Sequence, residues 1–253
     1  MVVTGTQTPE AVAWHDLECG SYRADLPLWR ELAADAAGPD GAAEILDVGA
    51  GTGRVTLDLA RQGHRLTAVD LDAELLAALR ARAGAPAPEI VCADARELDL
   101  ARREHALCIV PMQTLQLLGG AAERARFLSR ARAHVRPGGL VACAIVTELE
   151  AFDFRGSEAW PIAEQVTLDG MDYRSRAIRV AIDRRHIRIE RERSIRDAAE
   201  RIQGPTLNVV DLDRVSARRL LREGRDAGMA EAGVRTIPAT DEHVASEVVL
   251  LRV

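Results

Sequence analysis

The chain has 253 residues, of which 47% are hydrophobic, enough for one α/β domain with a sizeable core. Its 33 basic and 39 acidic residues give a net charge of −6, so no overall attraction to nucleic acid or to an anionic membrane is expected. Every basic residue is an arginine, and the lack of lysine excludes a P-loop lysine, a pyridoxal Schiff base and a lysine nucleophile.

Cysteine usage and hydropathy predict a soluble protein of the cytoplasm. The four cysteines form no Cys-x-x-Cys pair and have no His-rich partner segment, so neither a disulfide framework nor a zinc site is expected. They are Cys19, Cys92, Cys108 and Cys143. The N-terminus lacks a basic region followed by an apolar core, and no apolar run approaches the roughly 20 residues that span a bilayer.

The first 62 residues predict a frayed end, two helices and the first strand and helix of a sheet. Residues 1 to about 10 are small and polar. Apolar positions recur at helical spacing over 12–37, with interruptions at Gly20 and Pro27, and predict two short helices. A strand over 44–48 and a helix over 54–62 follow.

Strands and helices then alternate, which predicts a parallel sheet with helices on both faces. Strands are expected over 65–71, 89–92, 106–110 and 140–146; one helix is capped by Asp72 and stopped by Gly84, and another covers 121–135.

The C-terminal part has a different pattern. Strands over 164–168, 171–182 and 186–195 predict an antiparallel meander, and the broken alternation at Ala177–Ile178 predicts a bulge. A helix over 215–227 and two strands over 233–237 and 247–253 complete the expected elements.

The segment 43–55, AEILDVGAGTGRV, predicts a strand, a tight glycine turn and a helix. Gly49, Gly51 and Gly53 stand at alternate positions and let the backbone adopt positive φ and approach a ligand closely. The amides at the start of the next helix suit an anionic group. The spacing is G-x-G-x-G, not the G-x-G-x-x-G of dinucleotide-binding folds.

With Asp47 two residues before the first glycine, this segment resembles motif I of the class I S-adenosylmethionine (SAM)-dependent methyltransferases. The resemblance implies a Rossmann-like, mostly parallel seven-stranded sheet with an antiparallel last strand. It implies SAM as the cofactor, Asp47 as the acid that holds its ammonium group, and backbone contacts to the glycine turn. The residues of that turn are Gly49, Ala50, Gly51 and Gly53.

Three further segments carry the resemblance in the expected order. Asp70, 21 positions after Gly49, is placed like the acid that accepts the ribose hydroxyls, and Leu71 would pack on the adenine face. Asp94-Ala95 resembles the pair that reads the adenine edge, and Pro111-Met112-Gln113 occupies the position that faces the transferable methyl group. The segment 134–139, HVRPGG, matches the turn before the fifth strand.

Simpler interpretations accompany these assignments. Asp70 and Asp94 would serve equally as caps of the helices that follow them, and Arg54 as a solvated helix residue or an ion-pair partner.

The residues that bind the methyl acceptor are less determined, and no catalytic residue is assigned. In the family, the segment before the first strand folds over the cofactor as a lid, which makes Trp14, His15, Glu18 and Tyr22 neighbours of the site. His15 is a possible base and alternatively a surface histidine, while Gln113 would orient the acceptor without ionising. The remaining histidines are expected far from the site and receive no role: His64, His105, His134, His186 and His243.

Motifs that the chain lacks narrow the reaction. No Asn-Pro-Pro-Tyr, Asp-Pro-Pro-Tyr or Pro-Cys follows the fourth strand, which disfavours methylation of a base, a glutamine amide or a cytosine carbon. An acidic cluster that would hold magnesium is not evident. The meander is similar to the roof of glycine and amino-sugar N-methyltransferases, which favours a small acceptor. It holds ten arginines and five acids over 174–201, so an RNA-binding patch is the alternative to a solvated face.

The sequence thus predicts a metal-independent, SAM-dependent methyltransferase that acts on nitrogen or oxygen of a small molecule. A tRNA or protein methyltransferase is the alternative within the class; an NAD-dependent oxidoreductase or a non-catalytic SAM-binding module is the alternative outside it. We expect one domain, 1–253. Its parts are a helical lid (1–40), the SAM-binding core (41–146), an antiparallel roof insert (147–201), and the last helix and two strands (202–253).

Overall fold

The computed structural model describes residues 8–155, 162–241 and 243–253. The chain divides into two compact units. The core unit comprises Tyr22–Leu149 and Leu212–Val253, and the insert unit comprises Met1–Ser21 and Glu150–Asp211. Most of the expected frayed end lies outside the described residues, and helix α1 begins at Glu10.

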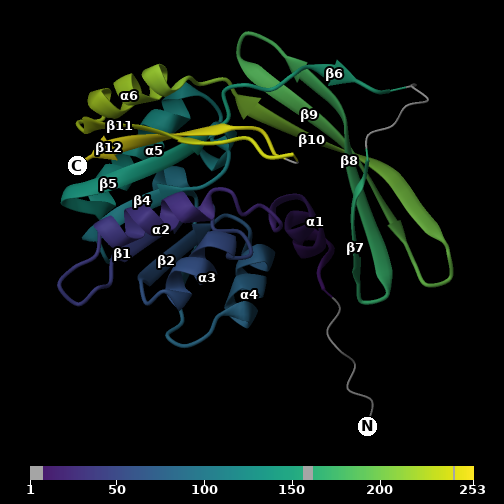
Figure 1. Cartoon of the computed structure of the whole chain (residues 1–253), viewed down its shortest axis with the longest axis horizontal. Coiled ribbons are helices and arrows are strands. Elements are labelled where there is room, and N and C mark those ends of the chain that lie inside the picture. The colour runs from purple at the N-terminus through teal and green to yellow at the C-terminus, as the bar shows by residue number, and fades with distance from the viewer. Residues whose placement is uncertain (1–7, 156–161, 242) are drawn as a thin grey trace. The chain divides into compact units, whose positions relative to one another are not determined.

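The core unit is built on a seven-stranded sheet (Figure 1). Its strand order is β11-β12-β5-β4-β1-β2-β3, and β12 runs antiparallel to both of its neighbours. The predicted Rossmann-like sheet with an antiparallel last strand is therefore confirmed. The strands are β1 (Glu44–Val48), β2 (Arg65–Asp70), β3 (Glu89–Cys92), β4 (His105–Val110), β5 (Val135–Ile145), β11 (Ala230–Ile237) and β12 (Ser246–Arg252).

Helices cover both faces of this sheet, as the near-continuous apolar strands require. One face carries α2 (Leu26–Asp35), α3 (Arg54–Arg61) and α4 (Ala73–Arg82), and the other carries α5 (Ala121–His134) and α6 (Ala217–Asp226). Two short 3-10 helices, η1 (Ala95–Glu97) and η2 (Thr114–Leu117), follow β3 and β4.

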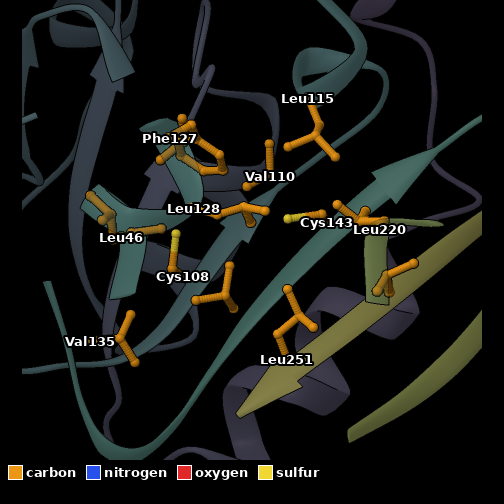
Figure 2. Close-up of a cluster of buried hydrophobic side chains, with 14 of the residues drawn as sticks. Leu46, Cys108, Val110, Leu115, Phe127, Leu128, Val135, Cys143, Leu220 and Leu251 are labelled. Atoms are coloured by element: carbon orange, nitrogen blue, oxygen red, sulfur yellow. The ribbon is translucent and has the colours of Figure 1, made fainter. Parts of the chain in front are cut away.

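Each central strand contributes side chains to two hydrophobic clusters, because successive side chains point to opposite faces of the sheet. In β1, Ile45 packs with the α2 and α3 side, while Leu46 packs with Phe127 and Leu128 of α5. Figure 2 shows the second cluster, in which Cys108 and Cys143 lie among these apolar side chains. Burial raises the pKa of the Cys143 thiol to about 12, so this cysteine behaves as a small core residue.

Most predicted boundaries agree with the structure to within two or three residues. Helix α4 ends at Arg82, two residues before the predicted stop at Gly84. Strand β5 begins at Val135 and not at Leu140, because the RPGG segment forms an irregularity within the strand: Val135 pairs with His105, and Leu140 pairs with Leu107. Asp72 caps α4 as predicted and accepts the Glu74 and Leu75 amides.

The insert unit contains helix α1 (Glu10–Cys19) and an antiparallel sheet. The predicted meander is confirmed as β7 (Glu164–Leu168), β8 (Met171–Ile182) and β9 (His186–Arg196), with a register shift between Ala177 and Arg179 at the expected bulge. Two strands were not expected, β6 (Phe152–Asp153) and β10 (Ile202–Asp213). β10 contains Gly204-Pro205, and it tolerates this proline because it forms one edge of the sheet.

Candidate functional site

The glycine turn after β1 has a conformation that only glycine accommodates at two positions. Gly49 has φ +77°, and a Cβ there would lie 2.4 Å from Thr114 Oγ1. Gly53 has φ +92°, and its Cβ would lie 2.8 Å from Leu79 Cγ. The backbone can therefore approach a ligand closely, as predicted for a cofactor cradle.

Asp47 lies at the end of β1 with its side chain inside the protein. Only 1% of the residue is exposed. Thr56 Oγ1 donates to Oδ2 at 2.5 Å, whereas Oδ1 has no hydrogen-bond partner among the described residues. Burial raises the pKa of Asp47 to about 6. Because buried polar atoms are almost always bonded, the orphaned oxygen fits a cationic ligand such as the ammonium group of SAM.

Asp70 ends β2 and is bonded to the glycine turn. Its Oδ2 accepts the Gly51 amide at 2.8 Å, and its Oδ1 accepts the Asp72 amide at 2.9 Å. Each carboxylate oxygen retains acceptor capacity for a hydroxyl. Leu71 beside it is 69% exposed, so its side chain can offer an apolar surface to a ligand. These two residues fit the predicted adenosine side of the cofactor.

Asp94 is occupied by a neighbouring arginine. Its Oδ1 accepts the Arg96 backbone amide, and Oδ2 accepts Arg96 Nη2 at 2.6 Å; these bonds lower the pKa of Asp94 to about 2. The carboxylate caps η1, whose first residue is Ala95, so the capping interpretation is confirmed for Asp94. For the helix after β2 the cap is Asp72 and not Asp70. A role of Asp94 and Ala95 toward adenine remains a prediction.

The turn after β4 contains a strained residue. Met112 has φ +55°, a left-handed conformation that non-glycine residues adopt rarely. Gln113 follows it and precedes η2. Strain of this kind clusters at functional sites. That this turn faces the transferable methyl group stays a prediction.

Tyr22 belongs to a polar and aromatic cluster of the core unit. Arg54 Nη1 and Nη2 donate to the Asp25 carboxylate at 2.6 and 2.7 Å, and the guanidinium carbon lies 5.2 Å from the Tyr22 ring centre. Burial, followed by the charge of Asp25, raises the pKa of Tyr22. The ion-pair interpretation of Arg54 is confirmed, but the pair is buried and not solvated.

His243 contacts this cluster, which the sequence did not predict. Its ring centre lies 4.7 Å from that of Tyr22. The expectation that His243 lies far from the candidate residues is therefore wrong. The loop between β11 and β12 brings it there, because β12 is antiparallel to β5 and starts beside the end of β5. By contrast, His64 and His134 accept the Ala43 and Leu100 amides inside the core unit.

Three of the other residues predicted near the site lie in α1 of the insert unit. Trp14 packs edge-on against Tyr173 with ring centres 5.1 Å apart, and its indole nitrogen donates to Glu10 at 2.9 Å. His15 lies 3.9 Å from Asp16. Glu18 accepts Ser175 Oγ at 2.6 Å and the Arg193 guanidinium at 2.7 Å. Trp14 and Glu18 thus fasten α1 to the insert sheet, and their role toward the acceptor remains a prediction.

Sequence reasoning missed several residues that hold this site. Thr56 donates to Asp47 and lies in the first turn of α3, nine residues after Asp47. This short spacing could have indicated the contact from the sequence. Asp25 and Thr114 gave none, since their partners are distant in sequence. Within residues 8–155, 162–241 and 243–253, no group of three or more His, Cys, Asp or Glu residues is placed to hold a metal. No helix of this described part is long and apolar enough to cross a membrane.

Comparison with known proteins gives a consistent picture. Residues 45–139 match the family model of the methyltransferase domain, and no curated protein matches the chain. The amino pentose methyltransferase CalS10 from Micromonospora echinaspora is 19% identical, with a TM-score of 0.69 and 100% of both chains covered. The sugar N-methyltransferase KedS8 from Streptoalloteichus is 19% identical, with a TM-score of 0.73 over 100% of this chain and 97% of that one.

The 1,6-didemethyltoxoflavin-N1-methyltransferase from Burkholderia thailandensis is 20% identical, with a TM-score of 0.58 over 95% of this chain and 83% of that one. At these identities each likeness shows a shared fold. The family match covers the segment that contains Asp47, the glycine turn, Asp70 and Met112. The matched segment supports a SAM-dependent methyltransferase with SAM as its cofactor, and the solved structures show that the chain has the class I fold.

Proposed function

We propose that the protein methylates the nitrogen of a small-molecule amine, with an amino sugar as the acceptor class and no metal in the reaction. The observation that carries the proposal is the antiparallel insert between β5 and α6, together with similarity over the whole length to an amino pentose and a sugar N-methyltransferase. A sheet inserted at this place favours a small acceptor over a polymer.

The residues of the core unit are assigned to the cofactor as follows. Asp47 would hold the ammonium group, the turn from Gly49 to Gly53 would contact the methionyl part, and Asp70 with Leu71 would bind the adenosine. Asp94, Ala95 and Met112 complete the proposed cofactor site. When bound, SAM supplies an electrophilic methyl group on a sulfonium.

The remaining task of the protein is to align the acceptor and to exclude water. Gln113 is a neutral donor and acceptor, and we assign it to acceptor orientation. Tyr22 and, from the insert unit, Trp14 and His15 remain acceptor-side candidates. An amine needs only to arrive unprotonated, so no general base is assigned. We further propose that both units form one methyltransferase domain, 1–253, that acts in the cytoplasm.

The experiment uses SAM with a labelled methyl group and two probes, a nucleoside-diphosphate-linked amino sugar and the same sugar with a hydroxyl in place of the amine. Mass spectrometry and NMR locate the label. We expect the label on the nitrogen of the first probe and no transfer to the second. Transfer to oxygen, or to added tRNA but neither sugar, would overturn the proposal.

A further inference from the structure

Gln116 is a buried polar residue that the cofactor site does not use. It lies in η2, only 1% of it is exposed, and its side-chain amide makes three hydrogen bonds. Nε2 donates to the Val146 carbonyl at 3.1 Å and to the Asp213 carbonyl at 2.9 Å, and Oε1 accepts the Val146 amide at 2.8 Å. The amide thus pairs with Val146 as a neighbouring strand would.

The two partners of Gln116 are the points where the chain leaves and re-enters the core. Val146 follows β5 directly before the segment that leads to the insert sheet, and Asp213 is the last residue of β10, which returns from it. We call these three residues the Gln116 clamp. The clamp joins η2 to both chain connections of the insert.

A second layer of buried bonds fixes the Asp213 end of the clamp. Asp213 Oδ2 accepts Arg124 Nη1 at 2.9 Å and also the Gly120 amide. Arg124 is 2% exposed and donates two further bonds to Glu223 of α6. Because both charged partners of Arg124 belong to the core unit, the Asp213 carbonyl offered to Gln116 has a fixed position.

The clamp stands directly behind the strained turn. The Gln116 backbone amide donates to the Gln113 carbonyl at 2.8 Å, so Gln113 and Gln116 form one closed turn. Met112, one residue earlier, holds φ +55°. A residue in such a conformation persists only where its surroundings fix the backbone on both sides. β4 provides this on one side, and the side chain of Gln116 provides it on the other.

We propose that Gln116 is a positioning residue for methyl transfer, which holds Met112 and Gln113 in register with the two connections of the insert. The proposal rests on the SAM-dependent activity and on the assignment of the turn 111–113 to the methyl-facing side of the site. Donation to two carbonyls and acceptance from one amide require a carboxamide. An apolar side chain of the same volume would keep the packing but would no longer fix the positions of the backbone groups of Val146 and Asp213.

The test compares Gln116→Met and Gln116→Glu with the control His134→Leu. Methionine keeps the length of the side chain, and glutamate keeps the acceptor for Val146. His134 is equally buried and also bonds backbone groups, but it lies at the end of α5, next to the beginning of β5 and far along the strand from Val146. The concentration of folded sites is set by titration with S-adenosylhomocysteine (SAH).

We expect both Gln116 variants to lower kcat per SAH-binding site at least about tenfold on the amino-sugar probe, and to change the SAH Kd by less than about threefold. The control should lose stability and keep kcat per site. A Gln116→Met protein that loses stability with unchanged kcat would overturn the proposal and leave Gln116 as a packing residue.

Backbone hydrogen exchange tests the role of Gln116 without a methyl acceptor. In Gln116→Met with SAH bound, the amides of 112–118 should exchange at least about tenfold faster than in the wild type, while those of the glycine turn 49–53 keep their rates. Unchanged exchange over 112–118 would also overturn the proposal. If the wild type methylates neither sugar probe, the proposed acceptor class is wrong, and the hydrogen-exchange measurement still decides the role of Gln116.

Discussion

The amide of Gly51 donates to Oδ2 of Asp70 at 2.8 Å, so the acid that ends β2 is bonded to the turn that follows β1. The two predicted halves of the SAM site, methionyl and adenosyl, therefore share one hydrogen bond before any ligand arrives. This bond fixes the glycine turn at its middle residue, and it explains why Asp70 would serve the site in two ways.

Replacing Asp70 should weaken cofactor binding beyond the loss of a ligand contact. In Asp70→Ala the Gly51 and Asp72 amides lose their acceptor, and the turn loses its anchor. We expect the Kd for SAH, measured by calorimetry, to rise at least about tenfold. The matched control is Asp72→Ala, which removes the cap of α4 and should cost about 1 kcal/mol of stability while the SAH Kd changes little. Equal binding by both variants would count against the adenosyl assignment.

Gly49 and Gly63 have similar φ angles but different surroundings. Alanine substitution at each of them therefore distinguishes backbone strain from steric contact. Gly49 (φ +77°) would place a Cβ 2.4 Å from Thr114 Oγ1, whereas Gly63 (φ +91°) has no atom within 4 Å of a built Cβ. Gly63→Ala should therefore cost about 1 kcal/mol and leave SAH binding intact. Gly49→Ala should cost about 1 to 3 kcal/mol more and weaken SAH binding about tenfold or more, because the turn must move. Denaturant unfolding and calorimetry measure the two effects.

Cofactor affinity should depend on pH through Asp47. Burial raises the pKa of this carboxyl to about 6 in the free protein, and a bound ammonium group needs the charged form. The SAH Kd should therefore rise as the pH falls below about 6, approaching tenfold per pH unit, and should be nearly constant above about 7. Asp47→Asn should bind weakly and without this dependence. A flat wild-type profile between pH 5 and 8 would show that Asp47 does not meet the ammonium group.

The same pKa has the opposite consequence for the stability of the free protein. The unfolded-state pKa is about 3.9, so the folded protein binds a proton more tightly than the unfolded chain does. The contribution of Asp47 to stability is thus most favourable below about pH 4 and declines by about 3 kcal/mol as the pH rises through 6. Asp47→Asn should remove this decline, which urea unfolding of the ligand-free proteins at pH 4.5 and 7.5 would measure.

Neutralising three insert arginines should leave the activity unchanged. Arg188 is paired with Asp211 at 2.8 Å, and Arg176, Arg179 and Arg193 are likewise paired with carboxylates of the insert unit. These ion pairs reduce the local positive charge that the sequence suggested. For Arg184→Gln, Arg185→Gln and Arg188→Gln combined, we expect a stability change within about 1 kcal/mol and unaltered kcat. Loss of activity together with steep salt dependence would instead support an RNA acceptor.

Local pattern was sufficient for the elements that build the cofactor side. Glu44–Val48, Gly49 to Gly53 and the α4 cap Asp72 follow from apolar runs, turn residues and capping preferences within a few positions. The order of the strands and the antiparallel β12 were implied only by the resemblance to methyltransferases. The sequence pattern alone does not show beside which strand of the sheet a strand distant in the chain will lie.

The residues that were missed are held by long-range contacts. Asp25 meets Arg54 across 29 positions, and Gln116 meets Asp213 across 97. No local pattern indicates that the fold buries these polar side chains. β10 was overlooked because Gly204-Pro205 interrupts its pattern, although an edge strand tolerates proline. The contact of His243 with Tyr22 joins two residues far apart in the sequence, so no local pattern predicts it.

Calorimetric titration of SAH into the wild-type protein and Asp47→Asn at pH 7.5 tests the cofactor site most directly. We expect the wild type to bind SAH with a Kd in the micromolar range and the variant to bind at least about tenfold more weakly. Binding of NAD but not SAH or SAM, no heat at millimolar SAH, or equal affinity of the two proteins would contradict the account, the last by removing Asp47 from the site.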